Sequence, residues 1–203
     1  MGWIISIIIV AFVLLIIFLF NFYRDPQRKI PKGNNIVAPA DGKIINIINT
    51  AKNEIKINKG LLGKIKTLSK DVARECYVIS IFMSPIDVHI NRAPIDGIVK
   101  SVKYSKGKFF KAYDIEKSFE NEKNEIVIEN KNLKVKVIQI AGFLARRIKC
   151  YVYKNQKVNK GEKIAMIALS SQTAFIIPKG VELKVKTNQH VKAGETIIAD
   201  FRK

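Results

Sequence analysis

The sequence has few of the residues that bind metals or form disulfides. It contains two cysteines and two histidines in 203 residues. Cys76 and Cys150 lie far apart, and neither stands in a metal-ligand spacing. A mononuclear zinc site is not expected when only His89 and His190 are available. We therefore predict no metal site and no disulfide, and two isolated thiols fit a reducing cytoplasm.

Charged side chains are absent from residues 1–23. An apolar run covers residues 3–20 and is interrupted only by Ser6, so it is long enough to cross the hydrocarbon core of a bilayer as a helix. A cleavable signal peptide would have a basic start and a small-residue cleavage site, and this segment has neither. We therefore expect residues 1–23 to form one transmembrane helix that stays on the mature chain.

Basic residues follow directly after this anchor. Residues 24–35 contain two prolines, one glycine and four cations, which are Arg24, Arg28, Lys29 and Lys32. This composition is typical of a connector that leaves the bilayer. The positive-inside tendency then places the remaining domain, residues 36–203, on the cytoplasmic side of the cell membrane.

Acidic residues are scarce relative to basic ones. The chain has 36 Lys and Arg against 17 Asp and Glu, a formal net charge of +19. All of this charge belongs to the part after the anchor, which is long enough for one domain with a core. Its lysines are scattered without an aromatic-rich nucleic-acid motif, so we expect no nucleic-acid partner. The anchor instead favours anionic lipid as the partner, and the attraction to it contributes about 1 kcal/mol per nearby basic residue. The composition of the genome is an alternative cause of the positive charge.

Helical periodicity is absent after the anchor. The remaining chain has short runs rich in β-branched and aromatic residues, separated by turns that contain Gly, Asn and Lys. We predict a mainly β domain with strands at 43–48, 77–82, 125–128, 134–140, 147–153 and 182–186.

Two internal repeats narrow the architecture. APADGKI at 38–44 returns as APIDGIV at 93–99, and QKVNKGEKI at 156–164 returns as QHVKAGETI at 189–197. These motifs resemble the hairpins of lipoyl and biotinyl domains, so we expect a quasi-duplicated, flattened β-sandwich (a barrel-sandwich hybrid). A lipoate or biotin carrier is not supported, because none of the three methionines stands beside a lysine as the biotin signature requires.

A polar row includes His89. Apolar and polar residues alternate over 86–91, which predicts a strand with Asp87, His89 and Asn91 on one face and Ile86 on the other. An imidazole in this row fits a general base, and it equally fits a buried, hydrogen-bonded structural residue. His190 stands in a polar turn, and we expect it to be exposed.

A hydroxyl cluster, Ser170, Ser171 and Thr173, separates two apolar runs near the C-terminus. No G-x-S-x-G elbow surrounds it, and a Ser-Ser pair between strands is usually only a turn. The residues alone therefore leave Ser171 open between a turn residue and a nucleophile.

Several longer motifs occur in one order along the chain: FYRDP at 22–26, APADG at 38–42, MSPIDVHINR at 83–92, NEKN at 121–124, IAGFLARR at 140–147, GEKI at 161–164 and the serine pair. With them the chain resembles phosphatidylserine decarboxylase proenzymes. Its short length and single anchor are similar to the compact subgroup of bacteria and archaea, in which the archaeal substrate is archaetidylserine.

This resemblance implies a pyruvoyl cofactor made from Ser171. The Ser171 hydroxyl attacks the carbonyl of Ser170, and the chain splits into a β chain (1–170) and an α chain (171–203) that stay associated as a heterodimer. The pyruvoyl group forms a Schiff base with the amine of a serine phospholipid and accepts the electrons released when carbon dioxide leaves. The implied reaction converts phosphatidylserine or archaetidylserine to the corresponding ethanolamine lipid.

The resemblance also implies that His89 transfers a proton during decarboxylation and that Asp41 orients or activates groups during self-cleavage. Ser170 replaces a more frequent glycine, and Arg92 stands where long bacterial forms carry a second histidine. The sequence leaves open whether Arg146 and Arg147 face a phosphate group or solvent. A membrane-tethered adaptor without catalysis and a decarboxylase of a soluble amino acid remain alternatives, and the oligomeric state, including a homo-oligomer, stays open.

Overall fold

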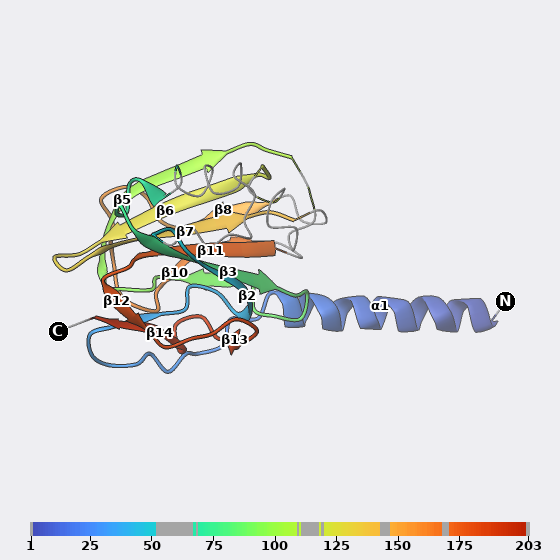
Figure 1. Ribbon diagram of the computed structural model, residues 1–203. Coiled ribbons are helices and arrows are strands. Elements are labelled where there is room, and N and C mark those ends of the chain that lie inside the picture. Colours follow the sequence, from blue (N-terminus) through green and yellow to red (C-terminus); the bar gives the residue numbers. More distant parts are fainter. Residues whose placement is uncertain are drawn as a thin grey trace.

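The computed structural model describes residues 2–51, 67, 69–108, 110, 118, 120–142, 147–167 and 171–201. Ser170 and Arg146 therefore lie outside the described residues. Helix α1 (Gly2–Phe22) extends away from the β domain (Figure 1), and Phe22 is its only buried residue. Its 21 residues span about 30 Å at helical rise, and it is long and apolar enough to cross a membrane.

After α1, the described residues 67, 69 and 118 are helical, while the elements whose bounds the structure describes are strands. In chain order they are β1 (Asn35–Val37), β2 (Gly42–Asn49), β3 (Cys76–Met83), β4 (Ile90–Arg92), β5 (Gly97–Ser105), β6 (Lys123–Glu129), β7 (Lys134–Ile140), β8 (Ile148–Cys150), β9 (Lys157–Val158), β10 (Lys163–Ile167), β11 (Ser171–Pro178), β12 (Val181–Leu183), β13 (His190–Val191) and β14 (Ile197–Phe201). The mainly β fold is thereby confirmed.

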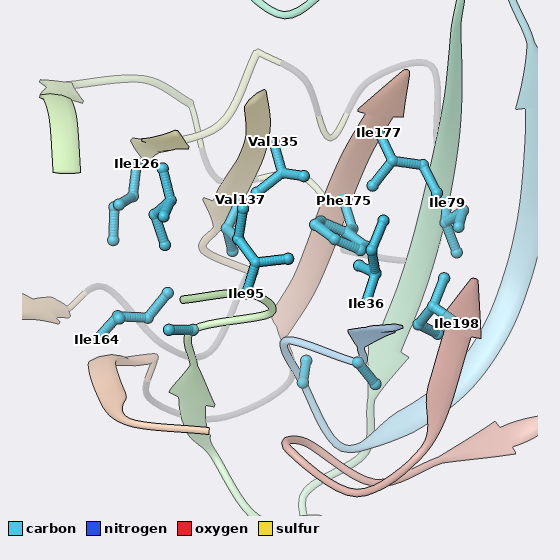
Figure 2. Close-up of a cluster of buried hydrophobic side chains, with 14 of the residues drawn as sticks. Ile36, Ile79, Ile95, Ile126, Val135, Val137, Ile164, Phe175, Ile177 and Ile198 are labelled. Carbon is cyan, nitrogen blue, oxygen red and sulfur yellow. The ribbon is translucent and has the colours of Figure 1, made fainter. Parts of the chain in front are cut away.

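These strands form one large and two small antiparallel sheets. The large sheet has the order β13-β2-β3-β11-β7-β6-β5-β9, and the small sheets have the orders β1-β14-β12 and β4-β10-β8. Figure 1 shows the large sheet curled beside the smaller ones. The main hydrophobic core lies between them, where Phe175 of β11 and Val137 of β7 face Ile36, Ile95 and Ile198 (Figure 2).

The central strands of the large sheet are also covered on their opposite face. A second cluster there contains Val78, Ile138, Ile140 and Ile176, with Val72 packed against it. Burial on both faces explains why these strands have nearly continuous apolar runs instead of strict alternation.

The internal repeats are structurally equivalent. Gly42 pairs with Val191, and Gly97 pairs with Val158, so each APxDG motif is bonded to one VxxGE turn. A side chain at Gly42 would place its Cβ 2.2 Å from the backbone oxygen of Phe82, which only glycine avoids. The quasi-duplication is confirmed, and the likeness to lipoyl and biotinyl domains stays a prediction.

Three predicted strands need correction. The strand expected at 147–153 covers only Ile148–Cys150, and the strand expected at 182–186 is Val181–Leu183. The strand expected over 86–91 begins only at Ile90. A turn replaces its first part, because the Asp87 carboxylate accepts hydrogen bonds from the Ser84 backbone amide and hydroxyl at 2.8 and 2.6 Å.

Candidate active site

Ser171 is the first residue of β11 and is fully buried. The two-residue period of a strand puts its side chain on the same face as Thr173 and Phe175, which is the face toward the main core. On the neighbouring strand β3, Met83 is the register partner of Ser171. Ser171, at the predicted cleavage site, therefore ends a core-facing row of side chains.

The sulfur of Met83 accepts hydrogen bonds from two hydroxyls of β11. It lies 3.6 Å from Ser171 Oγ and 3.5 Å from Thr173 Oγ1. A thioether is a weak acceptor and does not remove a proton. Among the described residues, no ionisable side chain hydrogen-bonds to Ser171, so its hydroxyl is held in place as a neutral group.

Polar side chains extend this row across the sheet. Thr173 pairs with Gln139 of β7, and Gln139 pairs with Asn124 of β6. The Asn124 amide donates to the Gln139 side-chain oxygen at 2.8 Å, and Gln139 donates to the Asn91 side-chain oxygen at 2.8 Å. Asn91, on β4, donates in turn to Thr173 Oγ1 and to the Pro39 carbonyl, both at 3.3 Å. This belt links the large sheet, β4 and the APADG turn.

His89 immediately precedes β4 and is fully buried. Its Nδ1 lies 2.8 Å from the backbone oxygen of Asp87. Because a carbonyl oxygen only accepts, Nδ1 carries the proton, and the lone pair of the neutral ring is on Nε2. No described residue hydrogen-bonds to this buried Nε2. A group in this state is available to a proton that arrives with a substrate.

The protonation of His89 is governed by its burial. Burial lowers the pKa of His89 below its usual value, although the hydrogen bond to the Asp87 backbone and the negative charge of Asp87 act in the opposite direction. The positive charge of Arg24 adds to the lowering of the pKa. The imidazole is therefore neutral near pH 7.

Asp41 is buried between the connector and the second repeat. Arg28 donates to both carboxylate oxygens, at 2.9 and 2.8 Å, and the Ala193 backbone amide donates at 2.8 Å. Burial raises the pKa of Asp41, and the hydrogen bonds from Ala193 and Arg28 offset part of that rise. The carboxylate is therefore held in one orientation by partners from two other segments.

Asp96 is the counterpart of Asp41 in the second APxDG motif, so it shows which contacts of Asp41 belong to the shared turn. It accepts a hydrogen bond from the Lys160 backbone amide at 2.8 Å, which matches the bond between Asp41 and Ala193. Each aspartate thus caps the VxxGE turn that is bonded to its own motif. Arg28 in addition binds both carboxylate oxygens of Asp41.

Arg92 forms an ion pair with Asp25. Its Nη2 lies 2.5 Å from Asp25, and its Nη1 donates to the Gly161 carbonyl at 2.9 Å. Asp25 also pairs with Lys163 at 2.5 Å. A guanidinium stays protonated at any ordinary pH, so Arg92 fixes the connector and does not act as the base that a histidine would be. Arg147 is exposed.

The predicted site residues are brought together in part. Ser171 joins the belt through Met83, and Asp41 adjoins it because Pro39, in the same turn, accepts from Asn91. The motif containing His89 contributes Asn91 to the belt, and the His89 ring packs on Phe22. Sequence reasoning missed a further set of site residues: Phe22, Arg28, Met83, Gln139 and Asn124. For Gln139 a signal existed, because it is polar at a position on the same strand face as the core residues Val135 and Val137.

Two surface clefts lie elsewhere on the domain. Their volumes are about 1190 and 830 Å³, and Asn34, Lys131 and Phe201 line both of them. Neither cleft contains Ser171, His89 or Asp41. The candidate site described above is a buried polar belt that is separate from both of these clefts.

Comparison with known proteins gives a consistent result. The family model described as phosphatidylserine decarboxylase matches residues 15–199. A protein of Methanocaldococcus jannaschii, provisionally named archaetidylserine decarboxylase proenzyme, is 44% identical over 188 residues, which are 91% of this chain and 90% of the relative. The phosphatidylserine decarboxylase proenzyme of Chlorobium limicola is 42% identical over 190 residues, 93% of this chain and 82% of the relative. The phosphatidylserine decarboxylase proenzyme of Chlorobium phaeobacteroides is 42% identical over 187 residues, which are 92% of this chain and 80% of the relative.

Proposed function

Because the chain belongs to the phosphatidylserine decarboxylase family, we propose that it is a membrane-anchored, pyruvoyl-dependent decarboxylase of a serine phospholipid. One observation carries the proposal. Ser171 is buried at the start of β11 in a belt of neutral polar groups, and the motif that supplies Asn91 to this belt also contains a neutral histidine whose Nε2 has no partner among the described residues. The product would be the corresponding ethanolamine lipid.

Maturation would use the chain's own serine pair. Ser171 Oγ attacks the carbonyl carbon of Ser170, and the peptide bond becomes an ester while the Ser171 nitrogen takes up the proton. Elimination of the Cα hydrogen of residue 171 breaks the ester, which leaves Ser170 with a carboxylate and residue 171 as dehydroalanine. Addition of water and loss of ammonia then leave a pyruvoyl group at residue 171.

The surroundings of Ser171 fit such a group. The residue is fully buried, with Met83 and Thr173 beside it and Asn91 one hydrogen bond further on, so water is excluded and neutral donors are near. A pyruvoyl carbonyl supplies the electron sink for the bond that carbon dioxide leaves. The hydrogen bond from Asn91 to Thr173 would hold β4 against the start of β11 around it.

His89 and Asp41 would have different roles. The free Nε2 of His89 would hold and return the proton that replaces the lost carboxyl group. Asp41 has its carboxylate oxygens bound by Arg28 and Ala193, so it would act by orienting the APADG turn whose Pro39 carbonyl accepts from Asn91. This supports an orienting role in self-cleavage over direct proton removal.

The sheet would hold the two cleaved chains together. β11 lies between β3 and β7, and it pairs with β3 over all its residues from Ser171 to Pro178. A cut before Ser171 would leave these ladders intact, so the α chain (171–203) would remain a central strand of the domain built by the β chain (1–170). Strand burial on both faces would add to this retention.

The anchor would set the substrate class. A chain held by α1 meets lipid headgroups continuously, and the basic connector would place the domain on the cytoplasmic face of the cell membrane. The test is to assay the purified protein on detergent-dispersed phosphatidylserine, on dispersed archaetidylserine and on free serine. We expect ethanolamine lipid and carbon dioxide from at least one lipid and none from free serine. Turnover of free serine alone, or no turnover at all, would refute the proposal.

A further inference from the structure

Phe22 joins the membrane helix to the candidate site. It is the last residue of α1 and is 3% exposed, whereas the rest of the helix has no buried residue. Its ring centroid lies 4.3 Å from that of the His89 imidazole, at an interplanar angle of 38°. Such a distance is direct contact between the two rings.

The position of the Phe22 ring is fixed from several sides. Phe18 stacks on it at 5.9 Å between centroids, and Tyr23 meets it edge-on at 5.1 Å. Arg24 donates to the Ile86 carbonyl at 2.7 Å, in the turn that leads to His89. Asp25 pairs with Arg92 on the other side of the histidine motif. The chain leaving the membrane is thus docked on the domain at consecutive residues.

His89 has few polar neighbours to determine its protonation. The charged groups that face it are Asp87, through its backbone oxygen and its charge, and Arg24. Its Nε2 is buried and has no partner among the described residues. An apolar ring packed on the imidazole excludes water from that side of the ring, and water would otherwise stabilise the charged form.

We propose that Phe22 is a positioning residue for His89: the last ring of the membrane helix packs on the imidazole, fixes its orientation and keeps its Nε2 dry. The catalytic consequence rests on the proposed function, whereas the packing and its effect on His89 do not. The anchor is then part of the site as well as a tether. Consistent with this, burial is the main cause of the lowered pKa of His89.

The chain supplies a matched control in Phe20. This residue lies two positions earlier on the same helix, and its side chain is 78% exposed. Phe22→Ala removes the ring from His89, Phe22→Leu keeps an apolar cover of smaller size, and Phe20→Ala removes an equal ring that faces away from the domain. All three are made in the full-length chain in detergent micelles.

The experiment is an NMR titration of the imidazole signals, which is tractable because the chain has only His89 and His190. We expect contacts between Phe22 ring protons and His89 imidazole protons in the unsubstituted protein. In Phe22→Ala the pKa of His89 should rise toward its usual value, in Phe22→Leu it should rise less, and in Phe20→Ala it should not move. The signals of the exposed His190 serve as the internal control and should be the same in all four proteins.

Activity on dispersed lipid supplies the second measurement. We expect Phe22→Ala to lower kcat roughly tenfold and to move the acid-side limb of the pH profile to higher pH, with KM little changed. Absence of the ring-to-ring NMR contacts would overturn the proposal even if Phe22→Ala did not fold. An unshifted His89 in Phe22→Ala, or an equal shift in Phe20→Ala, would also overturn it. No ethanolamine lipid from the unsubstituted protein would instead refute the proposed function and leave the NMR result standing.

Discussion

Ser171 Oγ lies 3.6 Å from the sulfur of Met83, its register partner on β3. The hydroxyl that would start self-cleavage is thereby oriented by a neutral acceptor in a buried belt, and no described carboxylate or imidazole contacts it. Reactivity in such a site depends on geometry more than on a permanently bound base.

Asn91 is the link between the sheets, and its loss should destabilise the domain. Asn91→Ala leaves the buried Gln139 amide without its acceptor, so the free energy of unfolding should fall by about 1–3 kcal/mol. Chemical denaturation in micelles measures this change. Asn132→Ala, at an exposed asparagine, should stay within about 0.5 kcal/mol of the parent. Equal effects of the two substitutions would show that the belt does not hold the sheets together.

Asp41 and Asp96 provide an internal comparison. Both accept from a backbone amide of the opposite turn, and Asp41 alone is bound by Arg28 with both oxygens. Asp41→Asn should slow self-cleavage and cost about 3 kcal/mol, because the buried Arg28 loses its bidentate carboxylate and keeps only the 3.9 Å ion pair with Glu195. Asp96→Asn should cleave at the parental rate. Pulse-chase gels measure both rates, and matching rates would remove Asp41 from the cleavage machinery.

His89 should be required for decarboxylation and dispensable for chain cleavage. His89→Asn should still give two chains but lower kcat about 10²–10⁴-fold, the range for loss of a general acid–base. Product assays on the purified, cleaved variant measure this. A variant that turns over at the parental rate would contradict the assignment.

The same residue should affect stability at acidic pH. Burial lowers the pKa of His89 below 6.5, so the unfolded chain binds a proton before the folded chain does as the pH falls. Its contribution to stability is constant above about pH 6.5 and is lost as the pH drops through the folded-state pKa. His89→Asn should lack this component of the acid-side loss, which denaturation curves at several pH values would show.

Some of this organisation is readable from the sequence, and some is not. The anchor, the repeats and the strands β2, β3, β6 and β7 follow from local composition and periodicity. The belt does not, because the approach of Gln139 to Thr173 and Asn91 depends on the register of strands far apart in the chain. The alternation over residues 86–91 also gave a wrong prediction. The Ser84 backbone amide donates a hydrogen bond to Asp87, and this local bond favours a turn over a strand.

In the connector, residues 24–35, the composition likewise did not predict the contacts of the arginines. Its basic composition predicts attraction to lipid, whereas Arg28 is directed inward to Asp41 and Arg24 to the Ile86 carbonyl. Charge counts do not distinguish a cation that faces a membrane from one that pairs with a buried carboxylate. Only the folded contacts assign these two arginines to the site.

Two truncations should separate the tether from the ring at its end. Deletion of residues 2–21 keeps Phe22, so activity on detergent-dispersed lipid should be retained while activity on vesicles falls. Deletion of residues 2–23 removes Phe22 as well, and activity should fall in both assays. If both truncations retain full activity on dispersed lipid, the helix contributes only membrane attachment.

Intact mass analysis of the purified protein shows whether Ser171 becomes the reactive group of the enzyme. We expect two chains, residues 1–170 and 171–203, with the smaller chain blocked at its N-terminus and reactive toward a carbonyl reagent such as phenylhydrazine. Ser171→Ala should give one uncleaved chain that does not react. A single full-length chain in the unsubstituted protein, identical to that of Ser171→Ala, would show that Ser171 is not converted.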